Sequence, residues 1–503
     1  MISFYADVLE GYDGASFAGV QAFKPFAKHF GTCDSNGACA LTPKIASLMN
    51  SLALVGKLAG TLIVGPLTEK LGHKKTMLFT CSTQILGVIV QVTSKTVAQF
   101  TVSRILIYIA VGLVENVTPT YQSEISPAAL RGFFVGSIQL FLTFGSLIAG
   151  IVNNEMAKST TQAGWMTASA LQALPAGIII VGLPFTPESP RWLLSKDRGD
   201  EALAILGKLR PAKDVQDGMV SIELTAIGDD QMQQVESGAK KEPWSSLFKG
   251  TNLRRTLIAT GIMALQQLTG VTFSSSYGPT FYKQVGLGKM AFAYAAINNG
   301  VSVVTAIIGM ILFDTVGRRS VTFYGCILQA VFLCLIGALG AKTDRSASDT
   351  DGMVASFIIY AAILHMSLGP AAYITAAEIG TSSLREKTMS FSTAVNVIVG
   401  FIVVSTTPYL MNPAYADLGA NLGYVWGGFS ALGAVWIWLC LPELKDRTLE
   451  ETDEIFTAGL PAWKFKGYQT SSPRSAVAMF PGNGDLSDMP KDTALELETA
   501  KKA

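Results

Sequence analysis

Stretches of about twenty mostly apolar residues follow one another between Met1 and Leu441, and they constrain the fold more than any other feature. They cover residues 1–22, 45–65, 76–94, 98–118, 132–153, 166–186, 255–281, 291–313, 320–340, 353–376, 388–409 and 423–441. A helix needs about 20 residues to cross the ~30 Å hydrocarbon core of a bilayer, where every backbone group must be satisfied locally. The sequence therefore predicts an all-α polytopic membrane protein with twelve transmembrane helices.

The composition agrees with this prediction and excludes several classes of protein. Only 15% of the 503 residues are charged, against about 25% in soluble domains, and the mean hydropathy is +0.38. A net charge of +1 gives no basis for binding nucleic acid. The sequence has no phosphate-binding Gly-x-x-x-x-Gly-Lys-Ser/Thr loop, no nucleophile motif and only three scattered histidines. We therefore expect no ATP-driven transport, no enzymatic activity, no cofactor and no metal site.

Lys and Arg residues concentrate in the segments that alternate spans place on one side of the membrane. By the positive-inside rule, this side is the cytosol, and both termini lie there; we expect the plasma membrane. The first span begins almost at Met1, so either the cytosolic tail before it is very short or the true start lies upstream. Cys33 and Cys39 share the first outside loop, and the sequence leaves open whether they form a disulfide.

The two halves of the chain repeat the same motifs about 250 residues apart. The paired segments are 65–75 with 309–319, 124–131 with 378–385, and 187–191 with 442–445. This repeat predicts two six-helix bundles. We expect the N-terminal bundle over 1–186, a cytoplasmic linker with short amphipathic helices over 187–254, the C-terminal bundle over 255–441, and a largely disordered cytoplasmic tail over 442–503.

Four short motifs are specific enough to indicate a family. They are Gly11-Tyr12-Asp13, Pro187-Glu188-Ser189-Pro190-Arg191-Trp192-Leu193, Gln266-Gln267-Leu268-Thr269-Gly270 and Pro442-Glu443-Leu444-Lys445. With them the chain resembles the sugar porters of the major facilitator superfamily over roughly residues 9–456. The segments 10–13 and 441–451 are most similar to the fungal α-glucoside (maltose) permeases. The resemblance implies a monomeric carrier that moves a sugar by alternating access, with a proton gradient as its source of energy.

Charged residues at the cytosolic helix ends repeat in both halves, which favours a gate over ordinary solvated charges. Salt bridges between two bundles can hold one side of a carrier closed and break when the bundles rock. The resemblance implies the same role. The gate residues are Glu69, Glu124, Arg131, Glu188, Arg191, Asp314, Arg318, Arg319, Glu378, Arg385 and Glu443. His73 stands where the family usually has Arg, so we expect a weaker cluster in the first half.

Ionisable residues inside a membrane span are costly and indicate function. We predict that Glu10, Asp13, Lys57, Arg104 and Glu115 take part in proton coupling. The resemblance implies that Asp13 pairs with Arg104 and that protonation of Asp13 releases the pair. A permanent buried ion pair is the structural alternative.

Lys57 departs from the family, because the α-glucoside permeases usually have an acid at this position. An unpaired lysine in mid-span must lose its proton or find a carboxylate. We expect Lys57 to pair with Glu10 or Glu115 and to alter coupling; the alternative is that it extends toward the membrane surface.

Sugars require amides, which donate and accept hydrogen bonds, and aromatic surfaces. We expect Gln139, Gln266, Gln267, Thr272, Asn299, Tyr373 and Asn396 to contact the substrate, with Tyr277 and Tyr282 as further aromatic walls. Thr272 stands where the family often has Asn, which puts hexose affinity in doubt. Isolated amides such as Asn153 and Asn298 are expected to join helices instead. Gly270 and Gly369-Pro370 are expected to interrupt their helices near the midplane.

The sequence therefore predicts a sugar:proton symporter. Three alternatives stay open. The protein could be a facilitative sugar uniporter if Lys57 removes coupling, a carrier or exporter of another polar metabolite, or a non-transporting nutrient sensor, against which the short tail argues. The sequence does not indicate which sugar is carried or in which direction.

Overall fold

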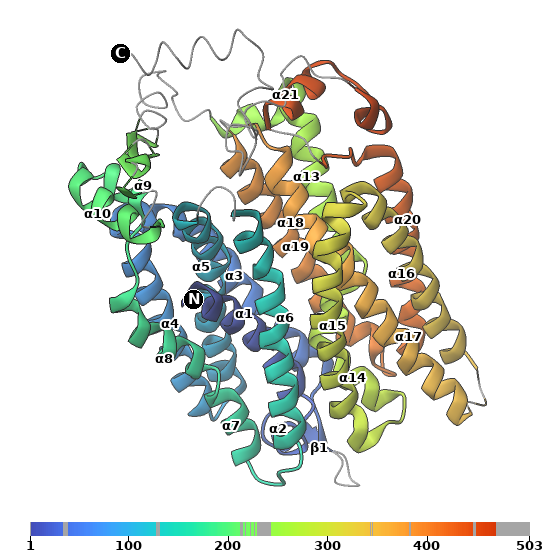
Figure 1. The fold of residues 1–503 in the computed structure, drawn as a ribbon. Coiled ribbons are helices and arrows are strands. Elements are labelled where there is room, and N and C mark those ends of the chain that lie inside the picture. The colour runs from blue at the N-terminus through green and yellow to red at the C-terminus, as the bar shows by residue number, and fades with distance from the viewer. Residues whose placement is uncertain are drawn as a thin grey trace, which may run out of the picture.

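The computed structural model describes residues 2–33, 39–126, 131–211, 215–216, 218–221, 223–225, 227–228, 243–342, 344, 346–381, 384–445 and 449–468. These residues form a helical protein whose N-terminal and C-terminal halves lie side by side (Figure 1). Eleven segments of the described residues are long and apolar enough to cross a membrane. The helix that carries Asp7, Glu10 and Asp13 packs along the other helices of its half and completes twelve spans.

The N-terminal half consists of α1 (Ile2–Val20), α3 (Pro43–Leu71), α4 (His73–Val92), α5 (Val97–Ile125), α6 (Arg131–Met156) and the pair α7 (Ala163–Ala170) and α8 (Ala173–Gly182). Two of its helices begin at a threonine whose side chain caps the first turn. The Thr42 hydroxyl accepts a hydrogen bond from the Ile45 amide at 3.3 Å, and Thr96 caps α5 in the same way through Gln99.

The C-terminal half consists of α13 (Gly250–Leu268) with α14 (Val271–Gln284), α15 (Ala291–Thr315), α16 (Arg318–Gly340), α17 (Ala347–Met366) with α18 (Leu368–Ile379), α19 (Arg385–Met411) and α20 (Leu422–Cys440). The breaks lie where the sequence predicts them. Gly270 has φ +91° between α13 and α14, and Ser367, next to Gly369-Pro370, has φ −124° and ψ −91° between α17 and α18.

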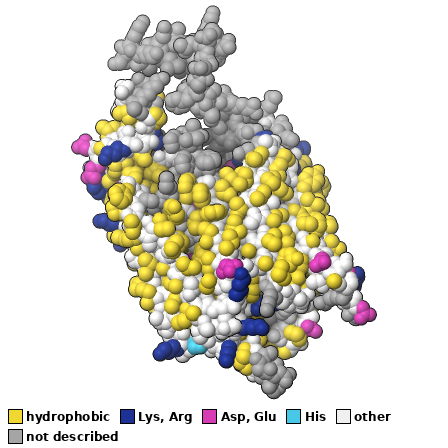
Figure 2. Space-filling view, turned by 60° about the horizontal axis from the view of Figure 1, so that its bottom comes forward, with side chains coloured by type: hydrophobic (Ala, Val, Ile, Leu, Met, Phe, Trp, Pro, Cys, Tyr) yellow, Lys and Arg dark blue, Asp and Glu magenta, His cyan; other side chains and the backbone are white. Residues whose placement is uncertain are grey.

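The lateral surface is apolar, as a bilayer requires. Figure 2 shows hydrophobic side chains over most of this face, with the charged side chains mainly toward its ends. Leu62, Val181 and Leu432 are among the most exposed, at 61%, 73% and 65%. In water such a surface would drive association, so the exposed leucines and valines identify the lipid-facing side of each helix.

Small residues let helices approach closely inside each half. On α3 a Cβ at Gly56 or Gly60 would collide with the backbone of α5, and a Cβ at Gly112 on α5 would collide with Lys57 on α3. Because lipid offers no hydrophobic drive for helix association, such close backbone contact stabilises membrane bundles through packing.

The two ends of the molecule differ. At one end, which we call the disulfide end, β1 (Thr32–Cys33) pairs with β2 (Cys39–Ala40) and Cys33 forms a disulfide with Cys39. This settles the state of the two cysteines that the sequence left open. The helix α2 (Lys24–Phe30) packs beside them.

The opposite end, which we call the linker end, carries α9 (Pro190–Leu194), α10 (Gly199–Leu209) and the 3₁₀ turn η3 (Trp244–Phe248). The expected amphipathic character of this linker is confirmed in α10, where Ala202 and Leu206 are fully buried. Shorter 3₁₀ turns lie at Leu183–Phe185, Gly288–Met290 and Gly419–Asn421.

The beginning of the predicted disordered tail is ordered. Helix α21 (Leu449–Thr457) and the turn η6 (Ala462–Gly467) pack on the start of α13, with Phe456 and Phe465 almost completely buried. The Arg254 guanidinium lies over both rings and donates to the Leu460 carbonyl oxygen at 2.6 Å. Residues 449–468 of the tail that was predicted to be largely disordered are therefore ordered, because these aromatic residues find an apolar surface to cover.

Candidate functional site

A cavity of about 280 Å³ lies between the two halves and is bordered by helices of both. Every residue predicted to contact substrate lines it: Gln139, Gln266, Gln267, Thr272, Asn299, Tyr373 and Asn396. Tyr282 lines it as well, whereas Tyr277 packs nearby and donates to the Val404 carbonyl oxygen. The structure therefore brings together side chains from α6, α13, α14, α15, α18 and α19 into one polar site.

The amides of the C-terminal half form one hydrogen-bonded network. The Gln267 side-chain NH₂ donates to Asn396 Oδ1 at 2.9 Å, and Asn396 Nδ2 donates to Gln266 Oε1 at 2.9 Å. Gln266 Nε2 in turn donates to the Gly369 carbonyl oxygen at 2.7 Å, and Thr272 donates to Gln267 Oε1. Gln266 thus fastens the network to the first turn of α18, next to the break after α17.

The sequence predicts that Asn153 and Asn298 join helices, and the structure confirms this for Asn153. Asn153 lines the cavity, but its Nδ2 donates to the backbone oxygens of Ala15 and Ser16, so it joins α6 to α1. Asn298 also lines the cavity, and its Oδ1 is buried without a hydrogen-bond partner among the described residues. Asn298 is therefore a further polar group available to a substrate. Its position in a polar pair with Asn299 was the signal that could have indicated it.

Lys57 lies at the centre of a buried charged cluster at the cavity wall. Its Nζ is 3.0 Å from Glu115 Oε2 and 3.5 Å from Glu10 Oε1. The Tyr373 hydroxyl donates to Glu115 Oε1 at 3.0 Å. The predicted pairing of Lys57 is thus confirmed with both carboxylates. Through Tyr373 on α18, the cluster also connects the N-terminal half to the C-terminal half.

Asp13 and Arg104 do not form the direct ion pair that the family resemblance implied. Asp13 is fully buried and accepts a hydrogen bond from Gln84 Nε2 at 2.5 Å. The Arg104 guanidinium lies between two aromatic rings, 4.3 Å from the centroid of Phe17 and 4.6 Å from that of Tyr108. An amide has taken the position of the cation beside Asp13, and this conformation therefore has the two charged groups apart.

Several buried polar residues were missed in the sequence. Gln84 on α4 contacts Asp13, and Gln122 Nε2 on α5 donates to Asp7 Oδ2 at 3.2 Å. Asn50 lines the cavity and donates to Gln21 Oε1 at 2.9 Å. Each is an amide inside an apolar run, which is the signal that selected Gln139; only the rotation of each helix decides which amide meets a carboxylate.

At the disulfide end, hydrogen bonds connect the two halves. Gln21 donates to the Ser276 carbonyl oxygen, the Ser47 hydroxyl donates to the Ser405 carbonyl oxygen at 2.9 Å, and Lys283 donates to the Ala22 carbonyl oxygen. Nearer the cavity, Asn299 Nδ2 donates to the Ser146 carbonyl oxygen at 2.8 Å. These contacts hold the halves together on this side of the cavity.

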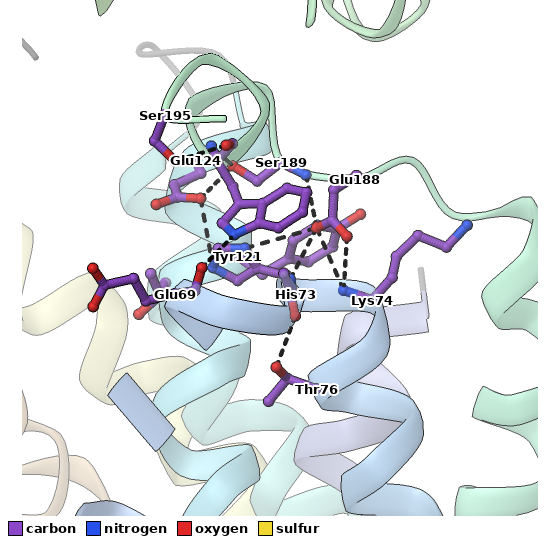
Figure 3. Close-up of polar contacts among 12 residues, drawn as sticks. Glu69, His73, Lys74, Thr76, Tyr121, Glu124, Glu188, Ser189 and Ser195 are labelled. Atoms are coloured by element: carbon purple, nitrogen blue, oxygen red, sulfur yellow. Dashed lines mark hydrogen bonds and ion pairs between the residues drawn. The ribbon is translucent and has the colours of Figure 1, made fainter. Parts of the chain in front are cut away.

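At the linker end, the gate residues of the N-terminal half gather around His73 (Figure 3). His73 Nε2 is 3.5 Å from Glu124 Oε2, and its Nδ1 is 3.8 Å from Glu188 Oε1. Glu188 also accepts from the backbone amides of His73 and Lys74, at 2.9 Å and 3.3 Å, and so caps α4. Ser189 donates to Glu124.

The C-terminal half repeats this arrangement. Glu443 accepts from the backbone amides of Arg318 and Arg319, at 2.9 Å and 3.1 Å, and Arg318 pairs with Glu378 at 3.1 Å. The pair of Arg318 with Glu378 is shorter than either contact of His73.

The remaining gate residues are less central or lie outside the described residues. The Glu69 side chain is exposed, although its backbone oxygen accepts from Trp192 Nε1 at 3.1 Å, and Arg385 is exposed and donates to the Ala377 carbonyl oxygen. Arg191 is half-buried on α9. The side chains of Arg131 and Asp314 lie outside the described residues.

The charged pairs at the linker end do not connect the two bundles, although the sequence led us to expect that they would. The pairs of His73 with Glu124 and Glu188, and of Arg318 with Glu378, each join residues of one half. A carboxylate at a helix N-terminus gains from the backbone amides and the helix dipole without crossing to the other half. The clusters therefore stabilise the linker end of each half separately.

Comparison with known proteins identifies relatives over most of the chain. The model of the family described as "Sugar (and other) transporter" matches residues 1–456. The probable glucose transporter rco-3 of Neurospora crassa is 30% identical over 475 residues, covering 92% of this chain and 80% of that protein. The general alpha-glucoside permease of Saccharomyces cerevisiae is 29% identical, covering 91% of this chain and 74% of that protein.

Solved structures show the same fold. The inward open conformation of the xylose transporter XylE from E. coli superposes with a TM-score of 0.74 at 21% identity, covering 90% of this chain and 98% of that one. The arrangement of helices described above is thus one already seen in a solved xylose transporter.

Proposed function

The chain belongs to the sugar (and other) transporter family of the major facilitator superfamily, and on that premise we propose that it carries a monosaccharide-sized sugar together with a proton. Transport proceeds by alternating access to the cavity between the halves. The relatives named above include a probable glucose transporter and an alpha-glucoside permease, which makes a sugar the first substrate class to test.

The amide-lined cavity is the observation that carries this proposal. Each amide side chain offers both a donor and an acceptor, as the ring of hydroxyl groups on a sugar requires. Tyr282 and Tyr373 supply apolar faces for the sugar ring. At about 280 Å³ the cavity is at the small end of the ~300–1,000 Å³ range of ligand pockets, which suits one sugar ring better than two.

The amide network links substrate binding to movement of α18. A sugar hydroxyl that binds Gln267 or Asn396 competes with the bonds these side chains make to each other. Gln266 shares this network and holds the Gly369 carbonyl oxygen, beside the break that frees α18 to bend. Substrate binding therefore changes the forces on the start of α18, whose Tyr373 closes against Glu115 of the other half.

Proton coupling is assigned to the buried carboxylates of α1 and α5. Asp13 is buried with an amide partner, and the Arg104 guanidinium stacks on Phe17 and Tyr108 instead of pairing with it. An aspartate in this setting binds a proton readily when its cation is away and releases it when the cation approaches. Glu10 and Glu115 share one lysine between them, so this cluster has one carboxylate more than it has cations.

A facilitative uniporter is the second candidate, favoured by Lys57. The ammonium group already neutralises one carboxylate at the cavity wall. If position 57 were an acid, the cluster would contain three carboxylates and no cation. With Lys57 present, the cluster therefore binds a proton less readily.

The linker end is assigned to the cytosol, in the plasma membrane, because the basic residues gather there. The cavity is enclosed by one chain, which supports a monomer, and transport itself requires no cofactor and no covalent chemistry.

Uptake by purified protein in liposomes tests the proposal. We expect at least one of a panel of labelled monosaccharides to accumulate under an inward proton gradient, and we expect a protonophore to abolish this accumulation. One pH unit of gradient supports about tenfold accumulation at one proton per sugar. Uptake that only equilibrates would favour the uniporter. No uptake of any monosaccharide or disaccharide would contradict sugar transport.

A further inference from the structure

Arg104 is held by two aromatic rings. It is 1% exposed, and its Nε and Nη1 have no hydrogen-bond partner among the described residues. The faces of Phe17 and Tyr108 lie 4.3 Å and 4.6 Å from its guanidinium carbon. Cation–π attraction is strongest where the cation is shielded from water, as it is here, so the two rings fix the position of the guanidinium.

The spacing along α5 connects this cation to the cavity. Arg104, Tyr108, Val111 and Glu115 recur at intervals of four, three and four residues and so lie on one face of the helix. Tyr108 and Val111 line the cavity, whereas Arg104 and Phe17 do not. Tyr108 therefore contacts the space that a substrate occupies and also stacks on the guanidinium.

Asp13 lies on the other side of this arrangement. Its carboxylate is held by Gln84 on α4, and the charged groups that act on it are Arg104 on α5 and Glu10 on its own helix. For Arg104 to reach Asp13 directly, the guanidinium must leave the stacked position between the rings.

We propose that Tyr108 transmits occupancy of the sugar site to the Asp13–Arg104 pair. A sugar packed against the cavity side of the Tyr108 ring keeps the ring stacked on Arg104, so the cation stays away from Asp13 and the Asp13 carboxyl keeps its proton. When the sugar leaves, the ring is free to move, Arg104 reaches Asp13, and the proton passes from the carboxyl group to water. Sugar and proton thus favour each other's binding, as symport requires.

This inference rests on the proposed sugar:proton symport, and Tyr108 is a positioning residue for the proton site. The test compares Tyr108→Leu, which removes the ring, with Tyr108→Phe, which keeps it. Two readouts are measured in liposomes: exchange of labelled for unlabelled sugar without a gradient, and accumulation of sugar driven by an inward proton gradient.

We expect Tyr108→Phe to behave like the wild type in both assays. Tyr108→Leu removes a ring that borders the sugar site, so exchange is expected to fall as well; accumulation should fall at least about fivefold further than exchange does, the lower range of typical coupling between two sites. A purely structural role would lower exchange and accumulation in parallel and would overturn the inference. So would accumulation by Tyr108→Leu at the wild-type level.

Three further cases can be told apart. If Tyr108→Leu is not monodisperse in detergent, Tyr108→Met, which fills a similar space with an unbranched side chain, takes its place under the same expectations. If the wild type exchanges no sugar, the proposed function fails and the inference falls with it. If the wild type accumulates sugar and the variant does too, the inference alone fails.

Discussion

At the scale of single residues, Lys57 is the position that most distinguishes this chain. Its ammonium group lies 3.0 Å and 3.5 Å from two carboxylates, and all three side chains are largely buried at the cavity wall. A buried charge of this kind is stable only when it is paired. The cluster therefore has a fixed composition of two acids and one base, and changing any member changes how many protons it binds.

Replacing Lys57 with Glu should increase the number of protons taken up with each sugar. Three neighbouring carboxylates cannot all be ionised without a cation, so at least one will bind a proton near neutral pH. The measurement is alkalinisation of the medium on addition of sugar, divided by sugar uptake. Lys44→Glu, on the exposed first turn of the same helix, is the control. An unchanged ratio in Lys57→Glu would remove Lys57 from coupling.

Replacing Gln267 with Leu should weaken sugar binding. The change removes the donor to Asn396 and the acceptor of Thr272, and it leaves polar partners unsatisfied at about 1–3 kcal/mol. We expect the half-saturation concentration for sugar exchange to rise by about tenfold or more. Gln99→Leu, at a half-buried amide near the disulfide end and outside the cavity lining, should leave it unchanged. Equal half-saturation in both variants would contradict a binding role for Gln267.

At the scale of elements, the same glycine turn with a capping carboxylate occurs at the linker end of both halves. Gly72 and Gly317 have φ of +83° and +109° and join α3 to α4 and α15 to α16. After each turn, the first backbone amides of the next helix donate hydrogen bonds to a carboxylate, Glu188 in the N-terminal half and Glu443 in the C-terminal half. The glycine allows the reversal and also leaves room for the carboxylate.

Replacing Gly317 with Ala should destabilise the protein by about 1–3 kcal/mol. The new Cβ would lie 2.6 Å from Glu443 Oε2, and the backbone conformation disfavours any side chain. Thermal unfolding in detergent measures the effect. Gly207→Ala, inside α10 with no neighbour near its Cβ, should be neutral or stabilising by up to about 1 kcal/mol. A midpoint for Gly317→Ala at or above that of the wild type would contradict this account.

At the scale of the whole molecule, contacts between the halves are unevenly distributed. Hydrogen bonds from Gln21, Ser47 and Lys283 cross between the halves at the disulfide end, while the contact of His73 with Glu124 and the pair of Arg318 with Glu378 at the linker end each stay within one half. Alternating access requires the contacts at the disulfide end to break when the cavity opens on that side.

Cross-linking the halves at the disulfide end should therefore stop transport. Cysteines at positions 21 and 276, joined by a short reducible bis-thiol reagent, would hold α1 against α14. We expect uptake to be lost on cross-linking and restored by reductant. The control pair, cysteines at 155 and 158, lies three residues apart within the N-terminal half and should transport normally when cross-linked. Full activity of the 21–276 pair while cross-linked would mean that this end does not open.

The sequence by itself determined the spans, the repeat and the chemistry of the cavity. Spans follow from runs of apolar residues, and the break at Gly270 follows from the conformational freedom of a glycine inside such a run; both are properties of the local sequence. The same holds for the amides, since Gln267 or Asn396 in an apolar helix has to face a polar interior.

The tertiary structure decided the partners. Gln84 instead of Arg104 contacts Asp13, Tyr108 stacks on Arg104, and Glu188 caps a helix of its own half instead of crossing to the other. Which of several polar side chains meet depends on the rotation of each helix about its axis and on the conformation of the carrier. Neither is encoded in the local pattern, because many rotations bury the same apolar residues equally well while only one brings a given amide to a given carboxylate.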